Sequence, residues 1–160
     1  MTHDVPALCR FMLDYLERII AEMTPDDLRR ANGSANPPGW ILGHLAIVAD
    51  FAGPMLKRPR QCPAAWHKAF GPGSDPHAEL PQQTAAEWAQ TIRNNYEGIL
   101  AVLPTADDAE LAQPHGSSLL ANTKIETKGQ LLSHLLTTHL ATHIGQLSAW
   151  RRSQGFLPLF

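Results

Sequence analysis

Two histidines lie four residues apart in the stretch His139-Leu-Ala-Thr-His143-Ile-Gly-Gln146, inside a long segment with apolar periodicity. On an α-helix, residues i and i+4 share one face, with Cβ atoms about 5–6 Å apart. Two such imidazoles can bind one divalent ion, at nitrogen–metal distances of about 2.0–2.1 Å for zinc, and open positions on that ion can take water or a substrate. The pair alone could equally be two half-buried polar side chains with backbone or solvent partners, because the chain holds 8 histidines in 160 residues.

A third histidine, His44, stands in a second apolar segment, Trp40-Ile-Leu-Gly43-His44-Leu-Ala. An imidazole buried there needs a polar partner, since an unpaired buried polar group costs about 1–3 kcal/mol. That partner could be a backbone carbonyl or a metal ion shared with His139 and His143, and we favour the metal ion. The small Gly43 would permit the close approach of another helix. No carboxylate has the helix phase to join the pair, so three histidines completed by water form the simplest ligand set.

The other histidines are expected to lie away from this site. His134 precedes His139 by five residues, about 140° around an α-helix, so its side chain should point elsewhere. Loop histidines are predicted to be solvated, although His67 or His115 could approach the site from a lid. The remaining two are His77, also in a loop, and the terminal His3.

Four long segments show the three- and four-residue apolar spacing of amphipathic helices, over approximately residues 4–23, 36–51, 84–103 and 127–154. Three of them begin with capping signals: Asn36 before two prolines, and a threonine followed three residues later by Glu or Gln at Thr84 and Thr127. A short helical turn is expected after Thr24, and Gly155 should end the last helix. Strand signals are nearly absent, so the sequence predicts a single all-α domain, residues 1–160, built as a four-helix bundle.

Two connections are longer than the roughly 2–8 residues typical between bundle helices. Residues 53–83 contain six prolines and three glycines, and they could form a crossover, a lid over a site, or both. Trp66 and Phe70 are expected to pin this segment to the bundle. Residues 104–126 form the second long connection.

The composition argues against several classes of partner. The net charge is −2, and the 13 Lys and Arg residues are scattered, so there is no basic footprint for nucleic acid. No apolar run approaches the roughly 18–20 residues of a membrane span, and the N-terminus shows no secretory signal. The two cysteines are too few for a disulfide framework, and Cys9 falls on an apolar helix face where an inert, buried thiol is expected. A cytoplasmic protein with no nucleic-acid or membrane partner is the default expectation.

Taken together, these motifs resemble the DinB-like (DinB/YfiT) superfamily of metal-binding four-helix proteins. The resemblance covers essentially the whole chain and rests on Trp40-x-x-x-His44, His139-x-x-x-His143-x-Gly-Gln146 and the trailing Arg151-Arg152. It implies an up-down-down-up bundle in which residues 53–83 cross over between helices two and three. It also implies a homodimer and a divalent metal ion, zinc or nickel, bound by three histidines. Those ligands map onto His44, His139 and His143.

Characterised relatives in this superfamily include low-molecular-weight thiol S-transferases and thiol-dependent isomerases. The resemblance therefore implies a small-molecule substrate and a low-molecular-weight thiol as a possible co-substrate. The leading hypothesis is a metal-dependent enzyme with a thiol S-transferase-like detoxification activity. A metal-dependent hydrolase and a non-enzymatic, metal-binding stress-response module are the alternatives, and the histidines could also hold no metal in the cell.

Residues around the histidines invite further expectations. Trp40 could wall a substrate pocket, and Gln146 could orient a ligand or bound water, with core or helix packing as the alternative for each. Gly145 is interpreted as a small residue at a close helix contact. The apolar tail should pack on the bundle or across a dimer interface; it comprises Phe156, Leu157, Leu159 and Phe160.

Overall fold

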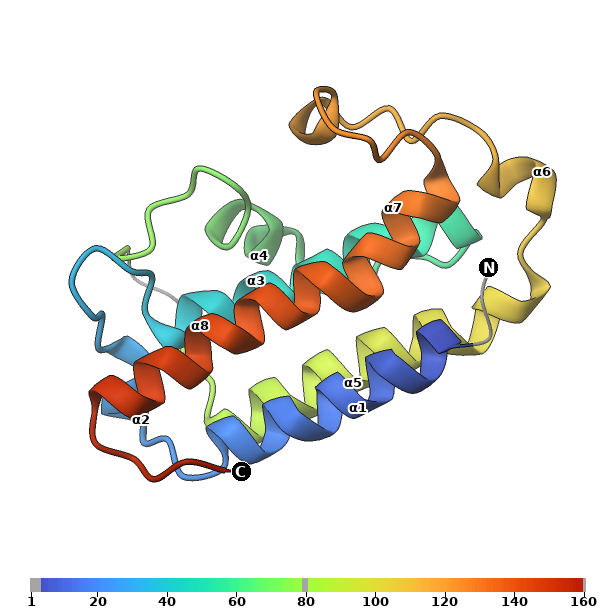
Figure 1. Cartoon of the computed structure of the whole chain (residues 1–160). Helices are drawn as coiled ribbons and strands as arrows, with labels where there is room; N and C mark the ends of the chain where they lie inside the picture. Colours follow the sequence, from blue (N-terminus) through green and yellow to red (C-terminus); the bar gives the residue numbers. More distant parts are fainter. Residues whose placement is uncertain (1–3, 79–80, 160) are drawn as a thin grey trace.

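The computed structural model describes residues 4–78 and 81–159. Four long helical elements lie side by side (Figure 1). They are α1 (Asp4–Ile20), α3 (Pro38–Ala52), α5 (Ala85–Val102) and a last helix that runs from α7 (Lys128–His134) through the π-helical turn η4 (Leu135–His139) into α8 (Leu140–Ser153). The short elements are α2 (Pro25–Arg29), η1 (Gly53–Leu56), α4 (Ala64–Ala69), η2 (Leu103–Thr105), α6 (Asp108–Leu111) and η3 (Ser118–Leu120). The described ranges contain no β-strand, which confirms the all-α prediction.

Figure 1 shows the directions of the long helices: α1 and the α7–α8 helix run one way, and α3 and α5 run the other. Helix α3 packs chiefly on α5, and α1 packs chiefly on α8 and α5. Buried side chains from all four form one hydrophobic cluster. The α3–α8 contact brings the two histidine-bearing helices together.

Side-chain caps define where three of the helices begin. The Thr84 hydroxyl accepts from the backbone N–H of Glu87, and the Glu87 carboxylate accepts in return from the Thr84 N–H. The same reciprocal box forms at Thr127 with Gln130, and at Thr24 before α2. These boxes satisfy N–H groups that have no partner within the helix, and they confirm the predicted starts.

The predicted cap of α3 at Asn36 is wrong. The helix starts at Pro38, its N-cap is Pro37, and no side chain caps it. The ring of Pro38 disfavours helical geometry in the residue before it, and Pro37 is accordingly extended at φ −59° and ψ 149°. Because neither proline has an N–H, fewer donors are left in need of a cap.

Helix α3 is the central apolar element, and every residue from Pro38 to Asp50 is buried. The stretch Pro38–Leu56 is long and apolar enough to cross a membrane by length and composition, which corrects the expectation that no segment approaches a span. However, 72% of that window is buried within the protein, and the core helix of a bundle passes the same test. The stretch is therefore weak evidence for a membrane helix.

The long connection after α3 is held against the bundle by aromatic rings, as predicted. Phe70 is fully buried, and its ring centroid lies 5.5 Å from that of Trp88 on α5. The Trp66 ring lies 5.0 Å from Trp88 as well. Gly43 on α3 leaves room for Phe70, since a Cβ there would lie 2.4 Å from the phenyl ring. The predicted close approach at Gly43 is thus real, but the crossover makes it rather than a long helix.

The chain turns back after α8 at Gly155, whose φ of +83° suits glycine and confirms the predicted stop. The Phe156 ring then packs near Trp150, with the Arg151 guanidinium 4.6 Å above its centroid. Leu157 is 80% exposed, so only part of the tail packs on the bundle. Phe160 lies outside the described residues.

Candidate metal centre

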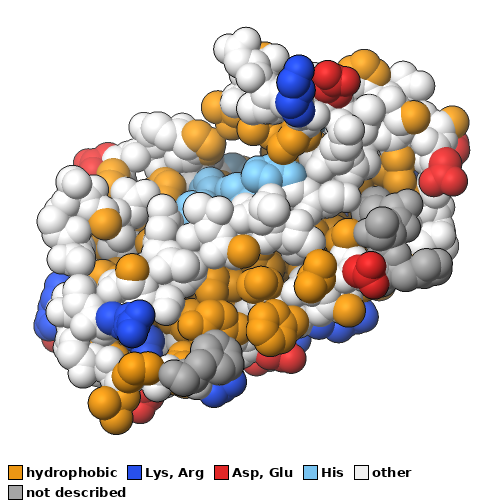
Figure 2. All heavy atoms as spheres, viewed as in Figure 1, with side chains coloured by type: hydrophobic (Ala, Val, Ile, Leu, Met, Phe, Trp, Pro, Cys, Tyr) orange, Lys and Arg blue, Asp and Glu red, His pale blue; other side chains and the backbone are white. Residues whose placement is uncertain are grey.

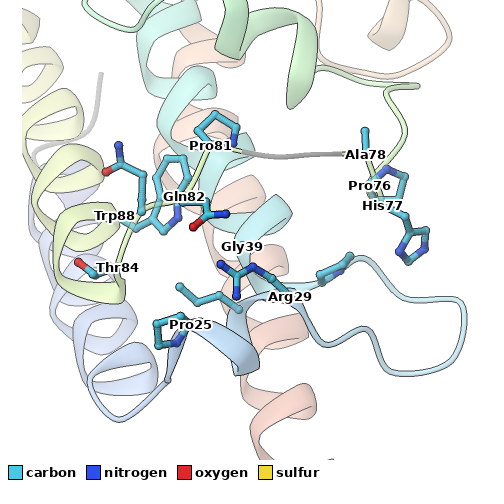
Figure 3. A pocket seen from close by; sticks show the side chains of 13 residues that line it. Pro25, Arg29, Gly39, Pro76, His77, Ala78, Pro81, Gln82, Thr84 and Trp88 are labelled. Carbon is cyan, nitrogen blue, oxygen red and sulfur yellow. The ribbon is translucent and has the colours of Figure 1, made fainter.

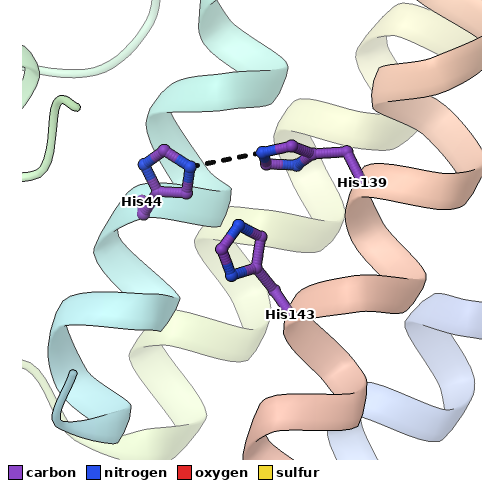
Figure 4. Close-up of side chains that lie close together, drawn as sticks. All are labelled: His44, His139 and His143. Atoms are coloured by element: carbon purple, nitrogen blue, oxygen red, sulfur yellow. Dashed lines mark hydrogen bonds between the residues drawn. The ribbon is translucent and has the colours of Figure 1, made fainter. Parts of the chain in front are cut away.

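Three histidines from two helices converge at the α3–α8 contact (Figure 4). His44 comes from α3, His139 ends the π-helical turn, and His143 lies one turn into α8. One ring nitrogen from each lies within 4.8 Å of the others, a group that could hold a metal ion. The structure thus brings together the three histidines that the sequence singled out.

The spacing of the ring nitrogens suits a small divalent ion. The Nε2 atoms of His44 and His139 are 3.3 Å apart. Two ligands bound at about 2.05 Å to a tetrahedral ion would be separated by about 3.3–3.4 Å. The ring of His143 lies 4.9 Å from His44 and 4.6 Å from His139 between centroids, at steep angles to both. Three imidazole donors are a ligand set that zinc, nickel and iron all accept.

Hydrogen bonds fix the orientation of two of the rings. His44 Nδ1–H donates to the backbone carbonyl of Phe70 at 2.8 Å, and His143 Nδ1–H donates to Gln146 Oε1 at 2.8 Å. A carbonyl oxygen accepts only, so both Nδ1 atoms carry the proton in neutral rings and both Nε2 lone pairs face the site. Metal-binding histidines are held in this way, with the distal nitrogen donating to a carbonyl or carboxylate.

His139 differs from the other two because its Nδ1 is buried without a hydrogen-bond partner. That nitrogen lacks a partner in either tautomer: it is an unpaired N–H donor when Nε2 binds a metal, and an unpaired lone pair when Nε2 carries the proton. His139 therefore lacks the outer hydrogen bond that orients His44 and His143, and only its position places it in the ligand set.

All three rings are kept neutral. Burial lowers the pKa of His44, although the bond to Phe70 opposes it. Burial, together with the neighbouring His143 and His44, lowers the pKa of His139 to about 3. Burial and His44 lower the pKa of His143 to about 4, against the bond to Gln146. Neutral imidazoles are the form that binds metals, so the site needs no deprotonation near pH 7.

The π-helical turn overturns one expectation. His134 does not point away, because its ring lies 5.7 Å from that of His139. A π turn closes i to i+5 hydrogen bonds, and so brings residues five apart onto a common face. Hydroxyls in this stretch bond back to carbonyls four residues earlier, as at Thr137 and Thr142, and such bonds bend helices. The three threonines Thr137, Thr138 and Thr142 are the sequence feature that accompanies this turn. His134 is not among the three nitrogens that converge.

Aromatic and polar side chains surround the rings. The Trp40 indole stacks on His44 with centroids 5.1 Å apart and planes 6° from parallel, and its Nε1–H donates to Ser74 in the crossover. Trp40 is 7% exposed, so it is mainly part of the core. Figure 2 shows histidine side chains in a surface hollow with hydrophobic side chains at its edges. His139 and His143 are only half-buried, so the centre is accessible to solvent.

Two histidines that were predicted to be solvated, His67 and His115, instead have hydrogen-bond partners within the protein. His67 Nε2 lies 2.7 Å from the carboxylate of the fully buried Asp50. His115 Nε2 lies 2.8 Å from the Ile125 carbonyl, and its Nδ1 accepts from the Ser117 N–H. Neither joins the three-histidine group. His77 is exposed, as expected.

The interpretation of Gly145 is also wrong. It is exposed, and a Cβ there would meet nothing within 4 Å, so it makes no close helix contact. Cys9 is fully buried, and burial raises the pKa of its thiol to about 12, which confirms an inert cysteine.

A cavity of about 450 Å³ lies apart from the three converging histidines, near the beginnings of α3 and α5 (Figure 3). Its lining includes Leu28, Arg29, Gly39 and Gln82. None of the three converging histidines lines it. Gly39 lies five residues before His44, about 140° around the helix, and so on a different face. This cavity and the metal centre are separate features.

The fold and the site together define a helical protein with a three-histidine centre between two long helices. A family model described as the DinB superfamily matches residues 9–147, which include all three histidines and Gln146. The chain therefore belongs to the DinB superfamily. No curated protein and no solved structure matches it significantly.

Proposed function

We propose that the protein is a metal-dependent enzyme whose divalent ion, zinc or nickel, is bound by His44, His139 and His143. The observation that carries the proposal is the convergence of three neutral imidazoles within 4.8 Å, two of them oriented by hydrogen bonds. Such an ion, when bound, supplies Lewis acidity that lowers the pKa of a coordinated water or thiol. With no carboxylate in the ligand group, its full positive charge remains available.

The protein groups around the ion have separate tasks in this proposal. The Phe70 carbonyl and Gln146 Oε1 hold the rings of His44 and His143. Trp40 forms an apolar wall beside His44 and is the proposed contact for an apolar part of the substrate. Gln146 is exposed next to His143, and it can also orient a ligand through its amide N–H groups.

Transfer of a low-molecular-weight thiol to a small electrophile, as in detoxification, is the proposed reaction. Its support is membership of the DinB superfamily together with an open three-histidine centre. Hydrolysis by an activated water is the alternative within the enzyme class. A non-enzymatic role, in which the ion joins α3 to α8, uses the same ligands.

Metal analysis combined with activity assays tests the proposal. Purified protein should retain about one metal per chain, and the metal-loaded protein should turn over one of a panel of thiol and electrophile pairs. His44→Ala should lose the metal, whereas His77→Ala, which alters an exposed histidine outside the site, should keep it. Stoichiometric metal in His44→Ala would exclude the ligand assignment. Bound metal without turnover on thiol or hydrolase substrates, and a melting temperature that falls sharply with chelator, would favour the structural role.

We also propose an up-down-down-up bundle, a homodimer, and a cytoplasmic location with no nucleic-acid or membrane partner. The helix directions and the long connection between α3 and α5 support the topology. Figure 2 shows hydrophobic side chains gathered over α1 and α8. On α1, Leu8 is 50% and Phe11 is 55% exposed. A groove of about 620 Å³ between the two helices includes Phe11 and Gly145. A second copy covering this face would bury these side chains.

A further inference from the structure

A fully buried carboxylate lies on the helix that carries His44, and the metal centre does not use it. Asp50 is 0% exposed, in an otherwise apolar helix. It follows His44 by six residues, about 9 Å along the helix axis. A buried carboxylate is strongly unfavourable unless hydrogen-bond donors surround it. The donors around Asp50 therefore indicate what it does.

All three donors to Asp50 come from the crossover that follows α3. They are the backbone N–H of Gln61, the N–H of Cys62 at 3.2 Å, and Nε2 of His67 at 2.7 Å. The Cys62 thiol beside them accepts from the Asn95 amide, and burial raises its pKa to about 11, so it stays protonated near pH 7. These hydrogen bonds to Asp50 hold the crossover against α3.

Helix α4 depends on such attachments for its position. It has six residues and no buried one, and isolated helices of this length are unstable. His67 attaches it to Asp50. At its C-terminal end, Phe70 packs its ring against Gly43 and accepts the Nδ1–H of His44 with its carbonyl oxygen at 2.8 Å. His67 on α4 and Phe70 at its C-cap are three residues apart, so this short segment connects Asp50 with His44 of the metal centre.

We propose that Asp50 and His67 are a positioning pair for the metal centre, holding α4 where the Phe70 carbonyl keeps the proton of His44 on Nδ1. With the proton there, Nε2 of His44 stays free to bind the ion. Neither Asp50 nor His67 touches the three converging nitrogens, so their effect passes through Phe70. The inference rests on the proposed function in taking His44 as a metal ligand.

His67→Ala is the informative variant, because it removes the side-chain link and leaves the two backbone donors to Asp50. His67→Gln is the conservative variant, because its amide N–H can replace Nε2–H. Thr84→Ala is the matched control, since it destabilises the start of α5 by removing a cap that is unconnected to α4. The tautomer of His44 is read by long-range ¹H–¹⁵N NMR in the presence of chelator, and zinc affinity is read by competition with a chromophoric chelator.

We expect the Nδ1–H tautomer of His44 in the wild-type protein and in Thr84→Ala. His67→Ala should give a mixture of tautomers and about tenfold weaker zinc binding, the lower end of the usual effect of outer ligand partners. His67→Gln should recover most of both. A wild-type tautomer and wild-type zinc affinity in His67→Ala would overturn the proposal. If that variant does not fold, His67→Asn, whose amide is too short to reach Asp50, is judged by the same two readouts.

The two proposals can fail separately. If the wild-type protein binds no zinc, the proposed function loses its support, yet the tautomer of His44 still reports on the positioning pair. If zinc binds but His67→Ala leaves His44 unchanged, only the positioning pair is excluded.

Discussion

The lowered pKa values of the half-buried His139 and His143 predict that the metal-free protein loses stability in mild acid. Their pKa values are about 3 for His139 and about 4 for His143, against an ordinary value of 6.5 that the unfolded chain should keep. Between these limits the unfolded state binds more protons than the folded state, so the free energy of unfolding falls as the pH falls. The contribution is complete above about pH 6.5, declines below it, and levels off near the folded pKa values.

The size of the effect follows from the same values. A pH of about 5 lies about 1.5 units below the pKa of an imidazole in the unfolded chain, and each unit corresponds to about 1.4 kcal/mol. Each histidine therefore lowers the free energy of unfolding by about 2 kcal/mol at this pH. The rings of His139 and His143 are 4.6 Å apart, and His143 is one cause of the lowered pKa of His139, so the two contributions are not independent. We expect a joint loss of about 2–4 kcal/mol, a large share of the roughly 5–15 kcal/mol of a typical domain. The lowered pKa of His44 acts in the same direction.

Urea unfolding with chelator present, between about pH 7.5 and about pH 5, measures this loss. The lowered pKa values of Asp27 and Glu87 contribute stability that is lost only below the ordinary carboxyl pKa of about 4, outside this window. The double variant His139→Gln/His143→Gln should show a much shallower dependence on pH. His77→Gln, at an exposed position, should keep the wild-type dependence. Wild-type stability that does not change over the window, or an equal slope in the double variant, would refute the reasoning.

Three further substitutions test other parts of the structure. Gly43→Ala should destabilise the protein by about 1–3 kcal/mol in urea unfolding, because its Cβ would lie 2.4 Å from the Phe70 ring; a neutral effect would mean that this contact is loose. Gly145→Ala should stabilise the monomer fold by up to about 1 kcal/mol, since nothing lies within 4 Å and alanine favours the helix; a loss would indicate a contact at that face. Phe11→Asp should shift the protein toward the monomer in analytical ultracentrifugation, with Asp4→Asn on the same helix as the control, and an unchanged dimer would exclude the α1–α8 face.

Most of the fold could be predicted from local signals. Apolar spacing located the long helices, and three threonine capping boxes located the starts of α2, α5 and α7 within the chain. These signals work because they act over three or four residues and depend little on the rest of the fold. The cap of α3 lies one residue later than predicted, at Pro37 rather than Asn36, because Pro38 restricts its predecessor more strongly than Asn36 attracts a cap.

The candidate site was predicted only as a set of residues. Helical spacing paired His139 with His143, and an imidazole in an apolar helix drew attention to His44. An ideal α-helix placed His134 on another face, whereas the π turn brings it to the ring of His139. The partners of His67 and His115 are a buried carboxylate and a backbone carbonyl, and neither is visible in the spacing of the histidines.

The sequence by itself therefore determined which residues could bind a metal and which helices carry them. Both depend only on residue type and on the three- to four-residue spacing of apolar side chains. Tertiary structure alone decided that Nε2 of His44 faces Nε2 of His139 at 3.3 Å, and that the Phe70 carbonyl lies behind His44. It also decided that Asp50 receives its donors from the crossover. Those contacts join residues up to 95 positions apart, and only the packing of α3 against α8 and α4 brings them together.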